Sequence, residues 1–187
     1  MSYFDDPKNI EEYVKMAEGF DGRELIEILK PHLKSGATVL ELGIGPGVDF
    51  ELLSEHYQVT GSDYSQAFLD RYGQKNPDAE LVLLNAVTMD IDRKFDCIYS
   101  NKVLHHLTRD DLKTSLHRQA DALNDKGILF HSFWYGDKEE DMHGLHFTYY
   151  TEETLRQAIS DEVQLLELKQ YTEMENADSL YLVLQKK

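Results

Sequence analysis

The stretch Val39-Leu40-Glu41-Leu42-Gly43-Ile44-Gly45-Pro46-Gly47 decides the fold of this 187-residue chain. It begins as a short hydrophobic run, typical of a buried strand, and continues into a turn with a glycine at every second position. Glycine lets the chain turn tightly and lets its backbone lie against a ligand, because no Cβ fills that space. A strand that runs into such a turn is typical of nucleotide-cofactor sites, although a purely structural turn between a strand and a helix has the same pattern.

Strand and helix patterns alternate around this turn. Short hydrophobic runs predict strands over residues 38–42, 57–61, 80–84, 95–100, 127–134, 163–168 and 179–184. Amphipathic stretches predict helices over residues 49–55, 66–72, 112–123 and 152–159. This alternation predicts an α/β fold with a doubly wound, mostly parallel sheet of seven strands. Such sheets bind their ligands at the carboxyl ends of the strands.

Two further segments lie outside this alternation. Residues 1–34 contain two amphipathic stretches and predict an amino-terminal helical cap, whose two apolar faces are formed by Ile10, Tyr13, Val14 and Ala17, then by Leu25, Ile26 and Leu29. Residues 135–151 form a long polar segment without regular periodicity, and we expect it to be an irregular substrate loop, because long loops in compact domains are usually functional. The whole chain, residues 1–187, has the length of a single domain.

The charge and the cysteine content restrict the partners and the setting. The formal net charge is −16, from 35 acidic and 19 basic residues, and the basic residues are scattered. Because nucleic-acid binding normally needs a basic patch, we expect no nucleic-acid partner. No apolar run is long enough for a membrane span, so we expect no membrane partner. The single cysteine, Cys97, excludes an intramolecular disulfide, and we expect a cytoplasmic location.

A second acidic position follows the next predicted strand. Asp63 lies 20 positions after Gly43, and a carboxylate there can accept hydrogen bonds from both hydroxyls of a ribose. Asp63 or Ser65 can equally cap the following helix, and the two roles are compatible. A dinucleotide motif would need a third glycine at position 48, which is Val48, and this disfavours a nicotinamide-dependent oxidoreductase.

With Glu41 two residues before the first glycine, the sequence resembles class I S-adenosylmethionine-dependent methyltransferases of the group that modifies small molecules. Their first motif is an acidic residue followed by x-G-x-G-x-G, which this chain matches at every position. Their second motif corresponds to Asp63, their third, with an amide in place of the commoner carboxylate, to Asn85, and their fourth to residues 95–107. The resemblance implies a cofactor site made of Glu41, Gly43, Gly45, Gly47, Asp63, Tyr64, Asn85, Ala86 and Asn101.

The resemblance also implies the overall architecture and the activity. It implies the sheet order 3-2-1-4-5-7-6 with the last strand antiparallel, S-adenosyl-L-methionine as cofactor, and methyl transfer to a small molecule. The amino-terminal segment resembles the family's lid, from which Tyr13 can reach the cofactor, or it simply caps the sheet. A non-catalytic module that binds the cofactor as a sensor or partner subunit is the alternative function.

Three residues are candidates for proton transfer in such a reaction. His131 lies in the predicted fifth strand, His106 follows the fourth, and Tyr150 lies at the exit of the substrate loop. A general base is needed only when the methyl acceptor arrives protonated. Packing in the core is the alternative role for each of them. We predict no metal site, because His143 and His146 lie in an acidic loop without recognised ligand spacing.

Overall fold

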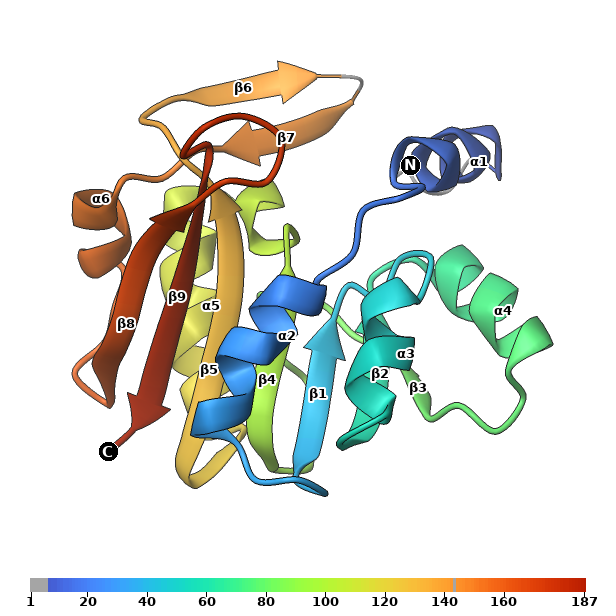
Figure 1. Cartoon of the computed structure of the whole chain (residues 1–187), viewed down its shortest axis with the longest axis horizontal. Helices are drawn as coiled ribbons and strands as arrows, with labels where there is room; N and C mark the ends of the chain where they lie inside the picture. Colours follow the sequence, from blue (N-terminus) through green and yellow to red (C-terminus); the bar gives the residue numbers. More distant parts are fainter. Residues whose placement is uncertain (1–6, 143) are drawn as a thin grey trace.

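The structure is a computed structural model that describes residues 7–142 and 144–187. A seven-stranded sheet with the order β3-β2-β1-β4-β5-β9-β8 forms its centre (Figure 1). The strands are β1 Thr38–Leu42, β2 Gln58–Asp63, β3 Leu81–Leu83, β4 Phe95–Asn101, β5 Leu123–Trp134, β8 Val163–Tyr171 and β9 Ser179–Lys186. β9 is antiparallel to both β5 and β8, and the other neighbouring strands are parallel. The predicted fold class and the implied strand order are therefore confirmed.

Helices cover both faces of this sheet, except α1, which stands over its carboxyl edge (Figure 1). They are α1 Pro7–Met16, α2 Arg23–Leu29, α3 Val48–Ser54, α4 Gln66–Lys75, α5 Arg109–Asp121 and α6 Glu152–Arg156, with the short 3₁₀ turns η2 Lys30–His32 and η3 Leu104–His106. α2 and α3 pack on one face together with α4, and α5 and α6 pack on the other. The two helices predicted within residues 1–34 are α1 and α2, and residues 1–6 of that segment lie outside the described part of the chain.

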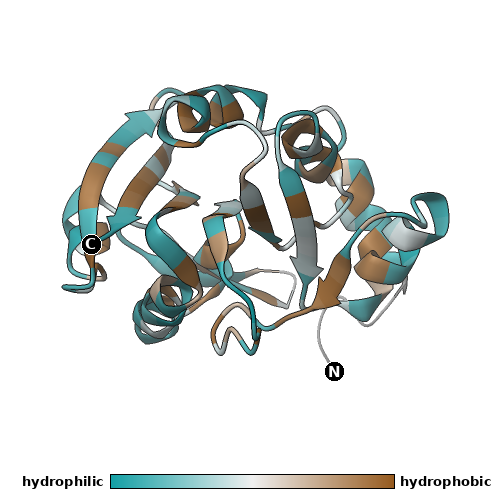
Figure 2. Cartoon of the chain, turned by 90° about the horizontal axis from the view of Figure 1, so that it is seen from below, coloured by the Kyte–Doolittle hydropathy of each residue, from teal (hydrophilic) through white to brown (hydrophobic). Residues whose placement is uncertain are grey.

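The sheet has a hydrophobic core on each of its two faces. A strand contributes side chains to both cores, because successive side chains point to opposite faces of the sheet. In β1, Val39 packs with Leu25 and Leu29 of α2, whereas Leu40 packs in the cluster that contains Leu112 of α5. Both strand residues are fully buried. Hydrophobic segments lie along the strands and on parts of the helices, while the outer turns are hydrophilic (Figure 2). The nearly continuous hydrophobic run of β1 is thus that of a strand buried on both faces.

The prediction of an irregular segment over residues 135–151 was wrong. β6 Glu139–Met142 and β7 Leu145–Thr148 form a separate two-stranded antiparallel sheet. β6 carries three acidic residues in a row and has no buried face, so no alternation of polar and apolar residues marks it as a strand. Its strand structure depends on hydrogen bonds to β7 instead.

Several predicted ends also differ from those of the structure. β5 begins at Leu123 rather than at residue 127, and its pairing with β4 is irregular between Phe95 and Cys97. α6 ends at Arg156, three residues before the predicted end. Among the described residues, no helix combines the length and apolar composition that a membrane span requires.

Candidate cofactor and acceptor site

The glycine turn leaves β1 at the carboxyl edge of the sheet and leads into α3. Gly43, Gly45 and Gly47 have φ angles of +69°, +48° and +89°, a region that other residues rarely adopt. A Cβ on Gly43 would lie 2.7 Å from Val103 Cγ1, and one on Gly47 would overlap the ring of Tyr72. Gly45 differs, because the nearest atom to its Cβ position is Tyr13 Cε1 at 3.7 Å. Two glycines are thus required by packing within the protein, and the third presents its backbone on a less crowded side.

Asp63 ends β2 directly beside this turn. Its Oδ2 accepts a hydrogen bond from the Gly45 N–H at 3.0 Å, and its Oδ1 accepts one from the Ser65 N–H at 2.8 Å. Burial raises the pKa of Asp63, whereas the backbone N–H donors lower it. The carboxylate therefore braces the turn and the entrance to α4, so the structure brings the first two predicted motifs together. Tyr64, the next residue, is 67% exposed. Its side chain therefore lies outside the core and is accessible to a ligand.

Two further carboxylates are buried behind the turn. Glu41 on β1 is 3% exposed, and its Oε2 has no hydrogen-bond partner among the described residues. Asp49, in the first turn of α3, accepts hydrogen bonds from the Gly22 N–H at 2.6 Å and the Tyr99 hydroxyl at 2.8 Å. Burial raises the pKa of Glu41 well above its ordinary value, and the charges of Asp49 and Asp63 raise it further.

Sequence reasoning missed Asp49. An acidic residue in the first turn of a helix ordinarily faces solvent and complements the helix dipole, so its type and position did not indicate burial. A Cβ on Gly22 would overlap both Asp49 and Tyr99, so glycine is the residue that fits there. The close approach of Gly22 to a helix 27 positions away is a property of the tertiary fold.

The third and fourth predicted motifs lie at the same edge of the sheet, but their residues form hydrogen bonds with different parts of it. Asn85 Oδ1 accepts the Val87 N–H at 2.8 Å, and the carbonyl oxygen of Ala86 accepts the Ser115 hydroxyl at 2.6 Å. Asn101, at the end of β4, donates from Nδ2 to Asp49 at 3.1 Å. The structure therefore joins Asn101 to the carboxylates behind the glycine turn, while Asn85 and Ala86 stabilise the turn after β3.

His106 lies in η3, directly after β4, against the β6–β7 hairpin. Its Nδ1 lies 2.7 Å from the carbonyl oxygen of His146, so this nitrogen carries the proton and Nε2 holds the lone pair of the neutral ring. The ring of Phe147 packs against it edge-on at 4.7 Å. Burial lowers the pKa of His106, and the bond to His146 raises it. The arrangement fixes a neutral imidazole whose accepting nitrogen is Nε2.

His105, which also follows the fourth predicted strand and is a further candidate base by that position, is buried beside it. It stacks on Phe147 with ring centroids 5.4 Å apart, and neither of its ring nitrogens has a hydrogen-bond partner among the described residues. Burial lowers the pKa of His105 well below its ordinary value, so the ring is neutral. Leu104 and Leu107 flank the two histidines, and in such an apolar stretch packing in the core is the alternative role for a histidine.

His131 and Tyr150 lie deeper than His106. His131 is fully buried within β5, with Nδ1 2.8 Å from the Ser100 hydroxyl oxygen, and burial lowers its pKa to about 3. Tyr150 is 1% exposed and packs edge-on against Phe133 at 5.2 Å, and burial raises its pKa to about 12. The structure therefore gives these two side chains the surroundings of core residues.

The burial of His131 predicts a measurable dependence of stability on pH. Its pKa is lower in the folded than in the unfolded protein, so the unfolded state binds an extra proton as the pH falls below about 6.5. Folding stability should then decrease by roughly 1.4 kcal/mol per pH unit from this residue alone. We expect His131→Asn to remove this contribution to the pH dependence of the free energy of unfolding, measured by urea titration between pH 6.5 and 4.5. His117→Asn, which changes a half-exposed histidine of α5, should keep it, and equal slopes in all three proteins would contradict the assignment.

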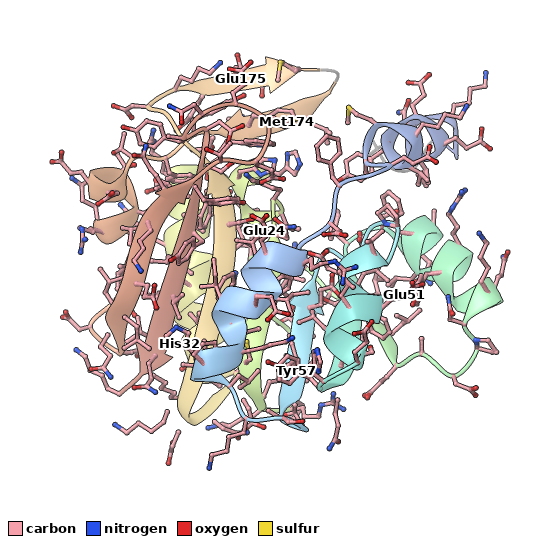
Figure 3. All side chains as sticks on the ribbon, in the orientation of Figure 1. Glu24, His32, Glu51, Tyr57, Met174 and Glu175 are labelled. Atoms are coloured by element: carbon pink, nitrogen blue, oxygen red, sulfur yellow. The ribbon has the colours of Figure 1, made fainter. Side chains whose placement is uncertain are left out.

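Lys102 is a second residue that sequence reasoning missed. Its side chain is 11% exposed, and its Nζ lies 2.7 Å from Glu173 Oε2 and 2.6 Å from Ser179 Oγ. The ammonium also lies 3.6 Å from the centroid of the Trp134 ring. Glu173 belongs to the β8–β9 loop, in which Figure 3 labels Met174 and Glu175. Lys102 thus fastens this loop to the ends of β4 and β5.

Two segments stand over the carboxyl edge of the sheet. α1 lies on one side and the β6–β7 hairpin on the other (Figure 1). Arg109 of α5 holds the hairpin through ion pairs with Asp137 and Glu139, at 2.9 and 3.0 Å. In the described part of the chain no group of three histidine, cysteine or acidic side chains is arranged to hold a metal, and His143 lies outside that part.

The sheet order, the glycine turn after β1 and the carboxylate at the end of β2 are those that the resemblance to S-adenosylmethionine-dependent methyltransferases implies. Residues 39–127 match the family described as methyltransferase domain. Over this stretch the chain carries a methyltransferase domain, and its fold is that of S-adenosylmethionine-dependent methyltransferases of known structure. A comparison with curated protein sequences found no significant match.

Solved structures of low sequence identity share the fold. An S-adenosylmethionine-dependent methyltransferase from Clostridium acetobutylicum ATCC 824 is 13% identical with a TM-score of 0.76, over 94% of this chain and 98% of the other. The 1,6-didemethyltoxoflavin-N1-methyltransferase of Burkholderia thailandensis is 20% identical with a TM-score of 0.74, over 95% and 87%. CalS10, an amino pentose methyltransferase from Micromonospora echinaspora, is 14% identical with a TM-score of 0.75, over 95% and 97%.

Proposed function

We propose that this methyltransferase transfers the methyl group of S-adenosylmethionine to a small-molecule acceptor at the carboxyl edge of its sheet. The observation that carries the proposal is the contact between the glycine turn and the Asp63 carboxylate. Bound S-adenosylmethionine supplies an activated methyl group, so the protein mainly has to orient the acceptor and exclude water. Orientation of this kind is worth ~7–11 kcal/mol.

The cofactor would lie along the residues that the four motifs bring to one edge. In this proposal Asp63 accepts hydrogen bonds from the ribose, Tyr64 flanks the adenine with Asn85 and Ala86, and the glycine turn lies under the rest of the molecule. Glu41 and Asn101 would lie closest to its charged end. Tyr13 supports a lid role for α1, because its ring approaches Gly45 and the charge of Asp63 contributes to raising its pKa.

His106 is the strongest of the three candidate bases. Its Nδ1–H donates a hydrogen bond to the His146 carbonyl oxygen, so the lone pair of the ring lies on Nε2. Nε2 can therefore take a proton from the methyl acceptor. His131, with its pKa lowered to about 3, is a weak base, and Tyr150, with its pKa raised to about 12, is a poor proton donor at neutral pH. We assign these two to the packing that supports the acceptor site.

The acceptor is proposed to be a small molecule because of the surface charge and the two covering segments. A net charge of −16 repels a phosphate backbone, so neither DNA nor RNA fits as substrate. Within a single domain over residues 1–187, we assign residues 1–34 as the cap over the cofactor and residues 135–151 as the cover of the acceptor. The ion pairs of Arg109 with Asp137 and Glu139, which tie this second segment to α5, support the assignment. In the hairpin, Phe147 packs against His105 and His106.

Replacing Asp63 with alanine tests the proposed cofactor site. Calorimetry should show S-adenosylmethionine binding at least about ten-fold more weakly, because charge-assisted hydrogen bonds to the ribose are lost. Asp70→Ala, which removes an exposed carboxylate of α4, is the matched control and should keep the affinity. Unchanged affinity in Asp63→Ala would refute the ribose assignment. Binding by the unmodified protein without methyl transfer to any acceptor in a metabolite panel would favour the sensor module instead.

A further inference from the structure

Three buried carboxylates, those of Glu41, Asp49 and Asp63, surround the start of α3. Glu41 is 3% exposed, and Asp49 and Asp63 are 9% exposed. None of the ion pairs formed by the described residues includes any of the three. Buried carboxylates ordinarily have a cationic partner or a full set of hydrogen bonds, because burial strongly disfavours the charged form.

Asp49 and Asp63 have hydrogen-bond donors, but Glu41 is left incomplete. Asp49 accepts hydrogen bonds from Gly22, Tyr99 and Asn101, and Asp63 accepts them from backbone N–H groups that include those of Gly45 and Ser65. Glu41 Oε2 has no partner among the described residues, although the side chain is almost completely buried. A buried oxygen without a hydrogen-bond partner is unusual in a folded protein. A bound ligand that interacts with Glu41 Oε2 would account for it.

The titratable groups around the cluster in the described part of the chain add no positive charge to it. The titratable side chains that act on the three carboxylates from neighbouring elements are an acid and tyrosines, namely Asp21 before α2, Tyr13 of α1, Tyr72 of α4 and Tyr99 of β4. Burial raises the pKa of all three tyrosines, so they stay neutral at physiological pH. Burial and mutual repulsion together favour a protonated Glu41 before the cofactor binds.

We propose that Glu41, Asp49 and Asp63 form a charge-selective subsite that binds the sulfonium cofactor with release of a proton and binds the neutral thioether product without it. The inference rests on the proposed function, since it concerns the same site. S-adenosylmethionine carries one more positive charge than S-adenosylhomocysteine, because methyl transfer converts the sulfonium into a thioether. The cationic form favours an ionised Glu41, and the product does not. After methyl transfer Glu41 therefore binds a proton again. The site then binds the product with lower affinity than the substrate.

Isothermal titration of the full chain in two buffers of different ionisation enthalpy counts the protons released on binding. The probes are S-adenosylmethionine, S-adenosylhomocysteine and sinefungin, which has an amine in place of the methylsulfonium group. Near neutral pH, we expect proton release with the two cationic probes and markedly less with S-adenosylhomocysteine. The ratio of the affinities for S-adenosylmethionine and S-adenosylhomocysteine should rise about ten-fold between pH 5.5 and 8, as for one coupled carboxyl group.

Variants identify the responsible group. Glu41→Gln preserves shape, and we expect it to abolish the differential proton release and hold the affinity ratio within about two-fold over the same pH range. Asp49→Asn should reduce both the differential proton release and the pH dependence of the affinity ratio. It provides a second test if Glu41→Gln folds poorly. Glu51→Gln, which changes an exposed acid of α3 (labelled in Figure 3), should leave both as in the unmodified protein.

The possible failures are distinguishable. If neither S-adenosylmethionine nor its product binds, the proposed function itself is wrong. If both bind with equal proton release and a ratio independent of pH, the cofactor site stands and the charge-selective subsite is refuted. If Glu41→Gln binds with the unmodified proton count, another group carries the linkage and the assignment to Glu41 is overturned.

Discussion

Gly45→Ala should weaken S-adenosylmethionine binding by about 10- to 100-fold while the protein still folds. The methyl group would meet only Tyr13 Cε1, at the ordinary contact distance of 3.7 Å, so the protein interior can accommodate it. In the proposed complex, however, the cofactor lies against this backbone, and an extra methyl in a close-packed contact costs roughly 1–3 kcal/mol. Calorimetric titration with S-adenosylmethionine measures the loss, and a urea titration checks the fold.

Gly36→Ala provides the matched control for backbone strain. Gly36 also has a positive φ angle, of +79°, and a Cβ there would meet no atom within 4 Å. Both substitutions therefore impose left-handed strain on an alanine, which destabilises a protein by about 1 kcal/mol or more. Only Gly45→Ala should lower the affinity. Equal affinities in the two variants would mean that the cofactor does not contact the turn at Gly45.

Local sequence patterns were sufficient for the strands and for the first two motifs, whereas the order of the strands in the sheet came from the family resemblance. The strand that leads into the glycine turn, and the carboxylate that ends the next strand, are defined by residues adjacent in the chain. In a parallel sheet, carboxyl ends of neighbouring strands necessarily meet at one edge. The contact between Gly45 and Asp63 follows from those two facts, and sequence reasoning could anticipate it.

The buried polar contacts could not be predicted in the same way. Asp49 bonds Gly22 and Asn101, which lie 27 and 52 positions away, and nothing in the local pattern around an acidic helix start identifies such partners. The β6–β7 hairpin was missed for a related reason. Its first strand has no apolar face, and its position depends on contacts such as those of Arg109 with Asp137 and Glu139.

Lys102 provides the largest expected effect on stability. Its ammonium is nearly buried, ion-paired with Glu173 and packed on the Trp134 ring. Burial lowers the pKa of Lys102 and the Glu173 carboxylate raises it, so the pair depends on both partners. Removing one member of a buried pair leaves the other charge uncompensated, which costs about 3–5 kcal/mol at full burial. Because Glu173 is 22% exposed, we expect Lys102→Met to lower the free energy of unfolding by about 3 kcal/mol.

Urea titration of four variants separates the ion pair from the other contacts of Lys102. Lys113→Met, which removes an exposed ion pair at 3.9 Å on α5, should change the stability by less than about 0.5 kcal/mol. Glu173→Gln leaves the ammonium without its carboxylate and should also destabilise the protein. The double variant Lys102→Met/Glu173→Gln should lose less than the sum of the two single losses, by at least ~1 kcal/mol, because each single change strands the other charge. Additive losses would show that packing on Trp134, and not the pairing with Glu173, makes Lys102 important for holding the β8–β9 loop.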